Sequence, residues 1–181
     1  IDTLMLHRMK DLELASVIGE LQRLKTKGKI NNIGVSVQSP SELEKVLKLK
    51  DVSLVQMPFN ILDNRWDYLI ESIRKARMER GLIVHARSAL LQGLLCVSDE
   101  SKWMAAGISN YEEIIAWLSK IRIHYEHSTI ADMCISYVNG QDWIDATVLG
   151  VTNEEELSAN LRSASLPLIS KTIIDEIRFS R

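Results

Sequence analysis

The residues of this sequence that could take part in chemistry stand where short apolar segments end. In chain order they are His7, Ser36, Gln56, the pair Arg87 and Ser88, and Gly150. A neutral histidine can donate one N–H to a developing alkoxide, serine and glutamine both donate and accept, and an arginine can bind an acidic group. By residue type alone, His7 is better explained as a histidine that caps a strand. The alternative explanation of Gln56 is a core amide bonded to neighbouring backbone.

Five segments rich in valine, isoleucine and leucine carry these residues and are predicted to be strands. They cover residues 1–7, 31–37, 52–59, 81–88 and 145–151. Their apolar character is mostly continuous, which is typical of strands buried on both faces of a parallel sheet.

Amphipathic helices are predicted between the strands, because apolar residues recur three and four positions apart. They cover residues 12–28, 39–50, 65–80, 153–162 and, as one longer helical stretch, 110–126 with 128–140. Ser39 and Pro40 form a typical helix start. Gly28 and Gly81 are typical stops. The alternation of strand and helix predicts an α/β chain of βα units with right-handed crossovers.

The distribution of polar residues over several strand ends separates two architectures. An open doubly wound sheet gathers its ligand groups at one switch point, usually with a glycine-rich turn after its first strand, and no GxGxxG occurs here. A (β/α)8 barrel builds its site from the ends of many strands. The sequence therefore predicts a parallel TIM-barrel type fold. In it, residues 1–181 form a single domain that supplies about five consecutive βα units, a partial barrel.

Composition excludes several classes of protein. The 181 residues are 46% hydrophobic, with 22 basic and 24 acidic side chains and a net charge of −2, which argues against nucleic-acid and membrane-surface partners. No apolar run reaches the roughly 18–20 residues that span a bilayer, and the start lacks a signal-peptide pattern. Cys96 and Cys134 lie far apart, without metal-ligand spacing. We therefore expect reduced thiols, no metal and a cytoplasmic location.

Five motifs, in order, give the chain a resemblance to a known family. They are IDTLMLHR, GKINNIGVSV, VQMPFNILDNR, IVHARSALLQGLL and VLGVTNEEELSANL. Together they resemble the later part of an aldo-keto reductase, from the fourth to the eighth barrel strand, in a bacterial branch with an RSxxLQGLL motif. The resemblance implies an NADPH- or NADH-dependent oxidoreductase. Its substrate would be a small molecule, with an aldehyde, ketone or sugar carbonyl to reduce or a sugar hydroxyl to oxidise.

The resemblance also implies roles for individual residues. His7 matches the family's active-site histidine, which hydrogen-bonds the substrate carbonyl oxygen. Ser36 and Gln56 match positions that hold the nicotinamide carboxamide. Further cofactor-binding positions are matched by Ser88, Gly150 and Asn160, the last of them an adenine contact.

The chain departs from the family pattern at three places. Val37 stands where an asparagine is usual, which removes one expected carboxamide contact. Arg87 replaces the tyrosine that stacks on the nicotinamide; an arginine can stack on a ring, or bind the cofactor diphosphate or an acidic substrate group. Residues 154–156 are glutamates where NADPH-preferring members carry basic residues. These carboxylates either repel a 2′-phosphate or complement the helix dipole, so the choice between NADPH and NADH stays open.

The family's catalytic aspartate, tyrosine and lysine lie on strands that precede this sequence. The tyrosines present fall in helical patterns that indicate packing: Tyr68, Tyr111, Tyr125 and Tyr137. We therefore expect the chain alone to be inactive. Its start at Ile1, without methionine, fits an enzyme whose earlier half is absent, disordered or on another polypeptide. The alternative is a non-catalytic scaffold or sugar- or ligand-binding domain that has kept the fold.

Two further expectations concern binding. Trp103, within residues 98–113, is either a wall of the substrate site or a side chain packed under that loop. Open barrel edges along segments 1–7 and 145–151 would present unpaired backbone groups. We expect them to pair with another chain, in a homo-oligomer or an edge-paired complex.

Overall fold

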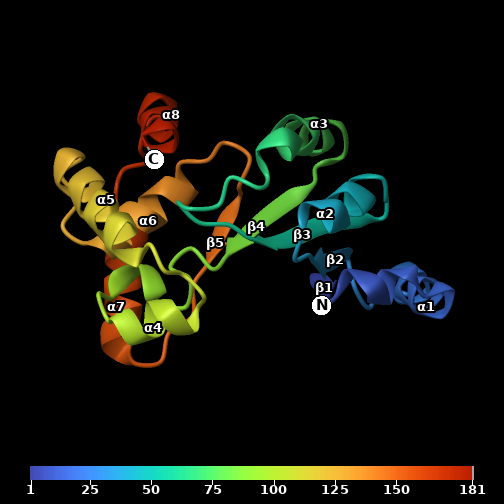
Figure 1. The fold of residues 1–181 in the computed structure, drawn as a ribbon. Coiled ribbons are helices and arrows are strands. Elements are labelled where there is room, and N and C mark those ends of the chain that lie inside the picture. The colour runs from blue at the N-terminus through green and yellow to red at the C-terminus, as the bar shows by residue number, and fades with distance from the viewer. Residues whose placement is uncertain (181) are drawn as a thin grey trace. The chain divides into compact units, whose positions relative to one another are not determined.

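The α/β architecture is confirmed by a computed structural model that describes residues 1–180. Five strands alternate with helices along the chain (Figure 1). The strands are β1 (Thr3–Leu6), β2 (Asn32–Ser36), β3 (Val52–Pro58), β4 (Ile83–Arg87) and β5 (Ala146–Val148). Each lies inside its predicted segment. The last is much shorter than predicted, with three residues.

One sheet contains all five strands, in the order β1-β2-β3-β4-β5. The β1–β2, β2–β3 and β3–β4 pairs are parallel. Asp145, next to β5, is tied to β4 twice: its N–H donates to the Val84 carbonyl at 2.8 Å, and its carboxylate accepts from the Val84 N–H at 2.7 Å. Strand order follows chain order, as expected for consecutive βα units.

The contacts group the residues into two compact units. Unit 1 comprises residues 1–58, 62–87 and 143–146, and unit 2 comprises residues 59–61, 88–142 and, as far as the structure describes them, those from 147 to 180. Each unit is described by itself below. The single domain over residues 1–181 stays a prediction.

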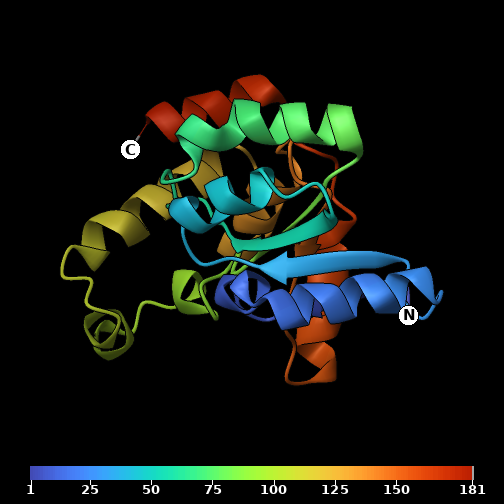
Figure 2. The same ribbon diagram turned by 90° about the vertical axis from the view of Figure 1, so that its right-hand side faces the viewer.

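Unit 1 buries one face of its strands. The residues of that face are completely shielded from solvent: Val35, Val55, Met57, Val84 and Ala86. Helices α1 (Ala15–Thr26), α2 (Pro40–Leu47) and α3 (Ile70–Arg80) supply matching buried side chains, among them Leu43, Val46 and Ile73. Figure 2 shows α1 and α3 lengthwise. Short 3-10 turns precede two of these helices, at Met9–Glu13 and Asp67–Leu69.

The predicted helix boundaries of unit 1 have identifiable causes. Ser39 caps α2, since its hydroxyl accepts from the Glu42 N–H, and Pro40 is the first helical residue. Gly81 ends α3 in the left-handed conformation at φ +66°, which glycine adopts without steric cost. The starts and stops predicted from these residues are confirmed.

Unit 2 is mainly helical. It contains α4 (Glu100–Ala105), α5 (Tyr111–His124), α6 (Ile130–Asn139), α7 (Glu154–Ala164) and α8 (Lys171–Phe179), and a 3-10 turn at Leu94–Cys96. Most of α6 is buried, and its fully shielded residues include Met133 and Ile135. Thr129 and Asp132 form a capping box at the start of α6. Helices α4 and α8 were not predicted.

The longer helical stretch predicted for residues 110–140 is wrong in one respect. The chain breaks it at Glu126, which has φ +58°, a conformation that interrupts a right-handed helix. The Arg122 guanidinium then donates to the carbonyls of His127 and Ser128, both at 3.2 Å. Two separate helices, α5 and α6, result.

Candidate functional site

Three polar side chains lie in register on one face of the unit 1 sheet. Ser36 on β2 is opposite Gln56 on β3, and Gln56 is opposite His85 on β4. Strand residues alternate between faces, so this row faces away from the shielded residues described above. Met5 and Ile83 share its face, and their side chains are 39% and 40% exposed. The row therefore lies on the less covered face of the sheet.

The side chains of this row have no hydrogen-bond partner within the part of the chain that the structure describes. Ser36 is buried, with 4% of its surface exposed, whereas Gln56 and His85 are half-buried. The interpretation of Gln56 as a core amide bonded to nearby backbone does not fit this geometry. Half-buried donors and acceptors without a protein partner suit a polar ligand or further protein.

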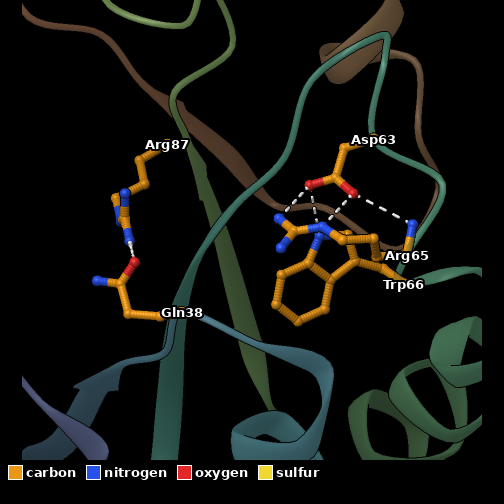
Figure 3. A network of polar contacts seen from close by, with 5 residues as sticks. All are labelled: Gln38, Asp63, Arg65, Trp66 and Arg87. Carbon is orange, nitrogen blue, oxygen red and sulfur yellow. Dashed lines mark hydrogen bonds and ion pairs between the residues drawn. The ribbon is translucent and has the colours of Figure 1, made fainter. Parts of the chain in front are cut away.

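Arg87 reaches across the carboxyl end of the sheet. One of its Nη atoms donates to Oε1 of Gln38, at 2.7 Å, and Figure 3 shows the two side chains meeting. Gln38 follows β2, while Arg87 ends β4 opposite Pro58 of β3. The contact between Arg87 and Gln38 therefore crosses the end of β3, which lies between β2 and β4. On β4, Arg87 comes two residues after His85, the member of the polar row on that strand. Its charge is held at this end of the sheet by a neutral amide.

His7 follows Leu6, the last paired residue of β1, and is exposed. Leu6 pairs with Val35, so His7 comes directly after the strand at the end that carries Ser36. The neighbouring Arg8 is engaged by Asp11, with both contacts at 3.2 Å. Among the predicted residues, His7, Ser36, Gln56 and Arg87 therefore all belong to strand ends of unit 1.

A second polar cluster follows β3 in unit 1. The Asp63 carboxylate, only 8% exposed, accepts from the Arg65 backbone N–H at 3.1 Å and from Trp66 Nε1 at 3.0 Å. It also accepts hydrogen bonds from Nε and one Nη of the Arg65 guanidinium, at 2.9 and 2.7 Å (Figure 3). Burial raises the pKa of Asp63, but these hydrogen bonds outweigh it, and the pKa lies below its usual value. All this hydrogen-bonding is internal, so the cluster shapes the turn after β3.

The remaining predicted residues belong to unit 2. Ser88 has a left-handed backbone at φ +64°. Gly150 is exposed, and no atom within 4 Å would meet a Cβ there, so packing does not require glycine at this position. Asn160 is half-buried on α7. Their roles in cofactor binding stay predictions.

Trp103 is completely buried in unit 2. Its indole N–H donates to the Val97 carbonyl at 2.8 Å, and its ring stacks on Tyr111 with centroids 6.4 Å apart. These contacts are those expected of a side chain packed under the loop, the second of the two predicted alternatives. The tyrosines differ among themselves: Tyr137 is buried against Phe59, but Tyr68 is 64% exposed.

Three glutamates begin α7, and one of them, Glu156, takes part in the hydrogen bonds at the start of the helix. The Glu156 carboxylate accepts from the N–H and the hydroxyl of Thr152, at 2.8 and 3.0 Å. Asn153 caps the helix by accepting from the Glu156 N–H at 2.8 Å. Glu154 and Glu155 are exposed beside Ser158 and Arg162. Glu156 thus complements the helix start, one of the two explanations considered for these carboxylates.

Both cysteines are free thiols. Burial raises the pKa of Cys134 well above its usual value, and burial also raises the pKa of Cys96. Within residues 1–180, no three side chains of the metal-ligating types gather into a group that could hold an ion. The helices of this same range are also too short or too polar to cross a membrane.

Two residues of the unit 1 site, His85 and Gln38, were not singled out from the sequence. His85 sits in IVHAR, where only alternate positions are polar, and this alternation from Ile83 to Arg87 is the signal that would have placed it on Arg87's face. Gln38 carried no comparable signal, because its role depends on a contact with a residue 49 positions away.

Comparisons with known proteins give one family and a set of similar structures. The aldo/keto reductase family profile matches residues 1–178. Aldo-keto reductase AKR11C1 from Bacillus halodurans matches at 20% identity, over 99% of this chain and 61% of that chain, with a TM-score of 0.81 in its apo form. Its holo form gives a TM-score of 0.78, at 20% identity over 99% and 60% of the two chains. A sequence comparison with curated proteins gives no match.

The glycerol dehydrogenase AKR11B4 from Gluconobacter oxydans is also similar. It matches at 20% identity and a TM-score of 0.71, over 98% of this chain and 58% of that chain. At such identities the likeness shows the fold. The chain spans about three fifths of the length of these solved structures.

Proposed function

This chain belongs to the aldo/keto reductase family, and from that premise we propose that it forms the cofactor-binding part of an NAD(P)H-dependent oxidoreductase. Its strands correspond in this proposal to the fourth to eighth strands of the (β/α)8 barrel. The reaction is reduction of an aldehyde, ketone or sugar carbonyl, or the reverse oxidation of a sugar hydroxyl. A bound nicotinamide cofactor supplies the hydride.

The observation that carries the proposal is the pairing of Ser36 with Gln56 within the polar row. A carboxamide has one acceptor oxygen and two N–H donors, and a hydroxyl beside an amide can satisfy both kinds of group. The register brings Ser36 and Gln56 opposite each other on neighbouring strands. Neither side chain has a hydrogen-bond partner in the described part of the chain, so both are available to a ligand.

His7 orients the substrate in this proposal. An exposed imidazole at a strand end can present one N–H to a carbonyl oxygen, and the bond strengthens as negative charge develops on that oxygen. Such a donor stabilises the transition state more than the bound substrate.

Arg87 lies two residues beyond the polar row on β4. Its planar guanidinium can stack on the nicotinamide ring, in place of the family's tyrosine, or it can bind an acidic group. Ser88, Gly150 and Asn160 are assigned to the rest of the cofactor, with Asn160 at the adenine. The capping bonds of Glu156 explain that glutamate without a nucleotide. These bonds do not distinguish NADH from NADPH, and titration with both cofactors decides between them.

Proton transfer needs residues outside this sequence. The family's tyrosine, lysine and aspartate belong to the first three barrel strands, and the tyrosines of this chain do not replace them. Tyr137 is buried, and Tyr125 donates its hydroxyl to Glu176 at 2.9 Å. The 181-residue chain alone is therefore expected to bind without turnover.

Titration of the intact protein with NADH and NADPH, followed by cofactor fluorescence, tests the proposal. We expect binding of at least one cofactor. Gln56→Ala should weaken it about fivefold to tenfold, the loss of about 1 kcal/mol from one neutral hydrogen bond. Ser53→Ala is the control, a half-buried β3 position at the register shift, where the hydroxyl already donates within the protein, to Asn32 at 3.2 Å. A wild-type protein that binds neither cofactor would favour the non-catalytic scaffold instead.

A further inference from the structure

We infer that His85 is an additional nicotinamide-binding residue, which hydrogen-bonds the cofactor carboxamide beside Gln56. The inference rests on the proposed function, because it assigns a ligand to the same sheet face. It adds a third side chain, from a third strand, to the pair formed by Ser36 and Gln56.

The register of strands β2, β3 and β4 places His85 beside Gln56. His85 is directly opposite Gln56, which is directly opposite Ser36. Neighbouring strands lie about 4.8 Å apart, so the row is about 10 Å wide from first to last strand. Gln56 stands in the middle, and a planar amide bound to it has one polar side chain on each side.

The surroundings of His85 favour a ligand over a structural role within unit 1. Its chain neighbours Val84 and Ala86 are completely buried on the opposite face, whereas His85 is half-buried. Its imidazole has no hydrogen-bond partner in the described residues. Both ring nitrogens can therefore meet a bound molecule, one as donor and one as acceptor.

Arg87 limits where such a molecule can lie. It follows His85 by two residues on the same face, and its guanidinium is fixed by Gln38 at 2.7 Å. A planar group held by the row then has a flat cation beyond it. This arrangement suits an aromatic ring bearing an amide, since guanidinium groups stack on such rings.

The competing explanation is that His85 packs against protein that covers this face. Met5 and Ile83 are apolar and exposed on it, so additional barrel strands could bury the whole face, His85 included. That explanation predicts an effect on folding stability and none specific to the nicotinamide group.

Calorimetric titration of the intact protein with two ligands separates the explanations. NADH contains the nicotinamide carboxamide, whereas ADP-ribose contains the rest of the cofactor without it. His85→Leu is expected to weaken NADH binding about tenfold and to leave ADP-ribose binding within about twofold of wild type. His85→Gln, which keeps a donor and an acceptor, should restore most of the NADH affinity.

Ile83→Leu is the matched control, because it changes an apolar residue on the same strand and face. An unchanged NADH affinity in His85→Leu overturns the inference while the proposed function stands. An equal loss for both ligands, together with a lower melting temperature, assigns His85 to the fold and also overturns it. If the wild type binds neither ligand, the proposed function fails, and the inference fails with it.

Discussion

At the scale of single residues, His7 is the residue whose removal separates chemistry from folding. It is exposed and has no side-chain hydrogen bond among the described residues, so His7→Ala should change stability by less than about 0.5 kcal/mol. Loss of a hydrogen bond that strengthens in the transition state should raise the barrier by about 2–4 kcal/mol. Turnover of the complete enzyme should therefore fall about 30- to 1,000-fold.

Steady-state kinetics and denaturant unfolding of the same His7→Ala preparation check this. Lys10→Ala, an exposed change three residues later, is the control. A variant that unfolds much more easily yet keeps normal turnover would show that His7 only caps the strand.

The Asp63 cluster makes stability depend on pH. The pKa of Asp63 is depressed in the folded state, so its contribution is complete above about pH 4, the ordinary value, and is lost as the pH falls through the folded pKa. Asp63→Asn should therefore lower the free energy of unfolding by about 1–3 kcal/mol at neutral pH, because the Arg65 and Trp66 donors lose a charged acceptor. The difference from wild type should shrink on acidification.

Urea unfolding at several values between about pH 3 and pH 7 measures the Asp63 effect. Asp51→Asn, an exposed aspartate of the same unit, is the reference. If the two variants lose stability equally at all pH values, the contacts around Asp63 do not produce a pKa difference between the folded and unfolded states.

At the scale of elements, the helix ends were more predictable than the breaks between helices. Ser39 as the start of α2 and Gly81 as the end of α3 could be predicted from residue type, because few residues cap a helix or adopt positive φ without cost. Glu126 gives no such signal, and its turn depends on Arg122 reaching two carbonyls beyond it. His85 was missed for a similar reason: only pairing with Gln56 makes it part of a row.

Two glycines of unit 1 give opposite expectations for the same substitution. Gly81→Ala forces a left-handed backbone on alanine, at φ +66°, and should cost about 1 kcal/mol. Gly19 lies within α1, and the space that an added methyl group would occupy is open, so Gly19→Ala should stabilise by about 0.5–1 kcal/mol. Denaturant midpoints of the two variants check the signs. A stabilised Gly81→Ala would contradict the assigned end of α3.

At the scale of the whole chain, β1 and β5 stand at the two ends of the strand order. An end strand offers unpaired N–H and C=O groups to another chain. Charges that would discourage pairing at β1 are confined to its flanks, at Asp2 and Arg8, and Met5 exposes 39% of its side chain on the sheet face. The purified 181-residue polypeptide is therefore expected to self-associate, or to pair with a fragment that carries the complementary strands.

Sedimentation velocity over a range of concentrations tests the association. Met5→Lys places a charge on β1 beside the exposed face and should shift the distribution toward monomer, whereas Met78→Lys, on the exposed surface of α3, should not. Added complementary fragment should form a one-to-one complex with wild type. A compact wild-type monomer that unfolds cooperatively would contradict the expectation of open edges. It would also contradict the assignment of these strands to the later part of a barrel.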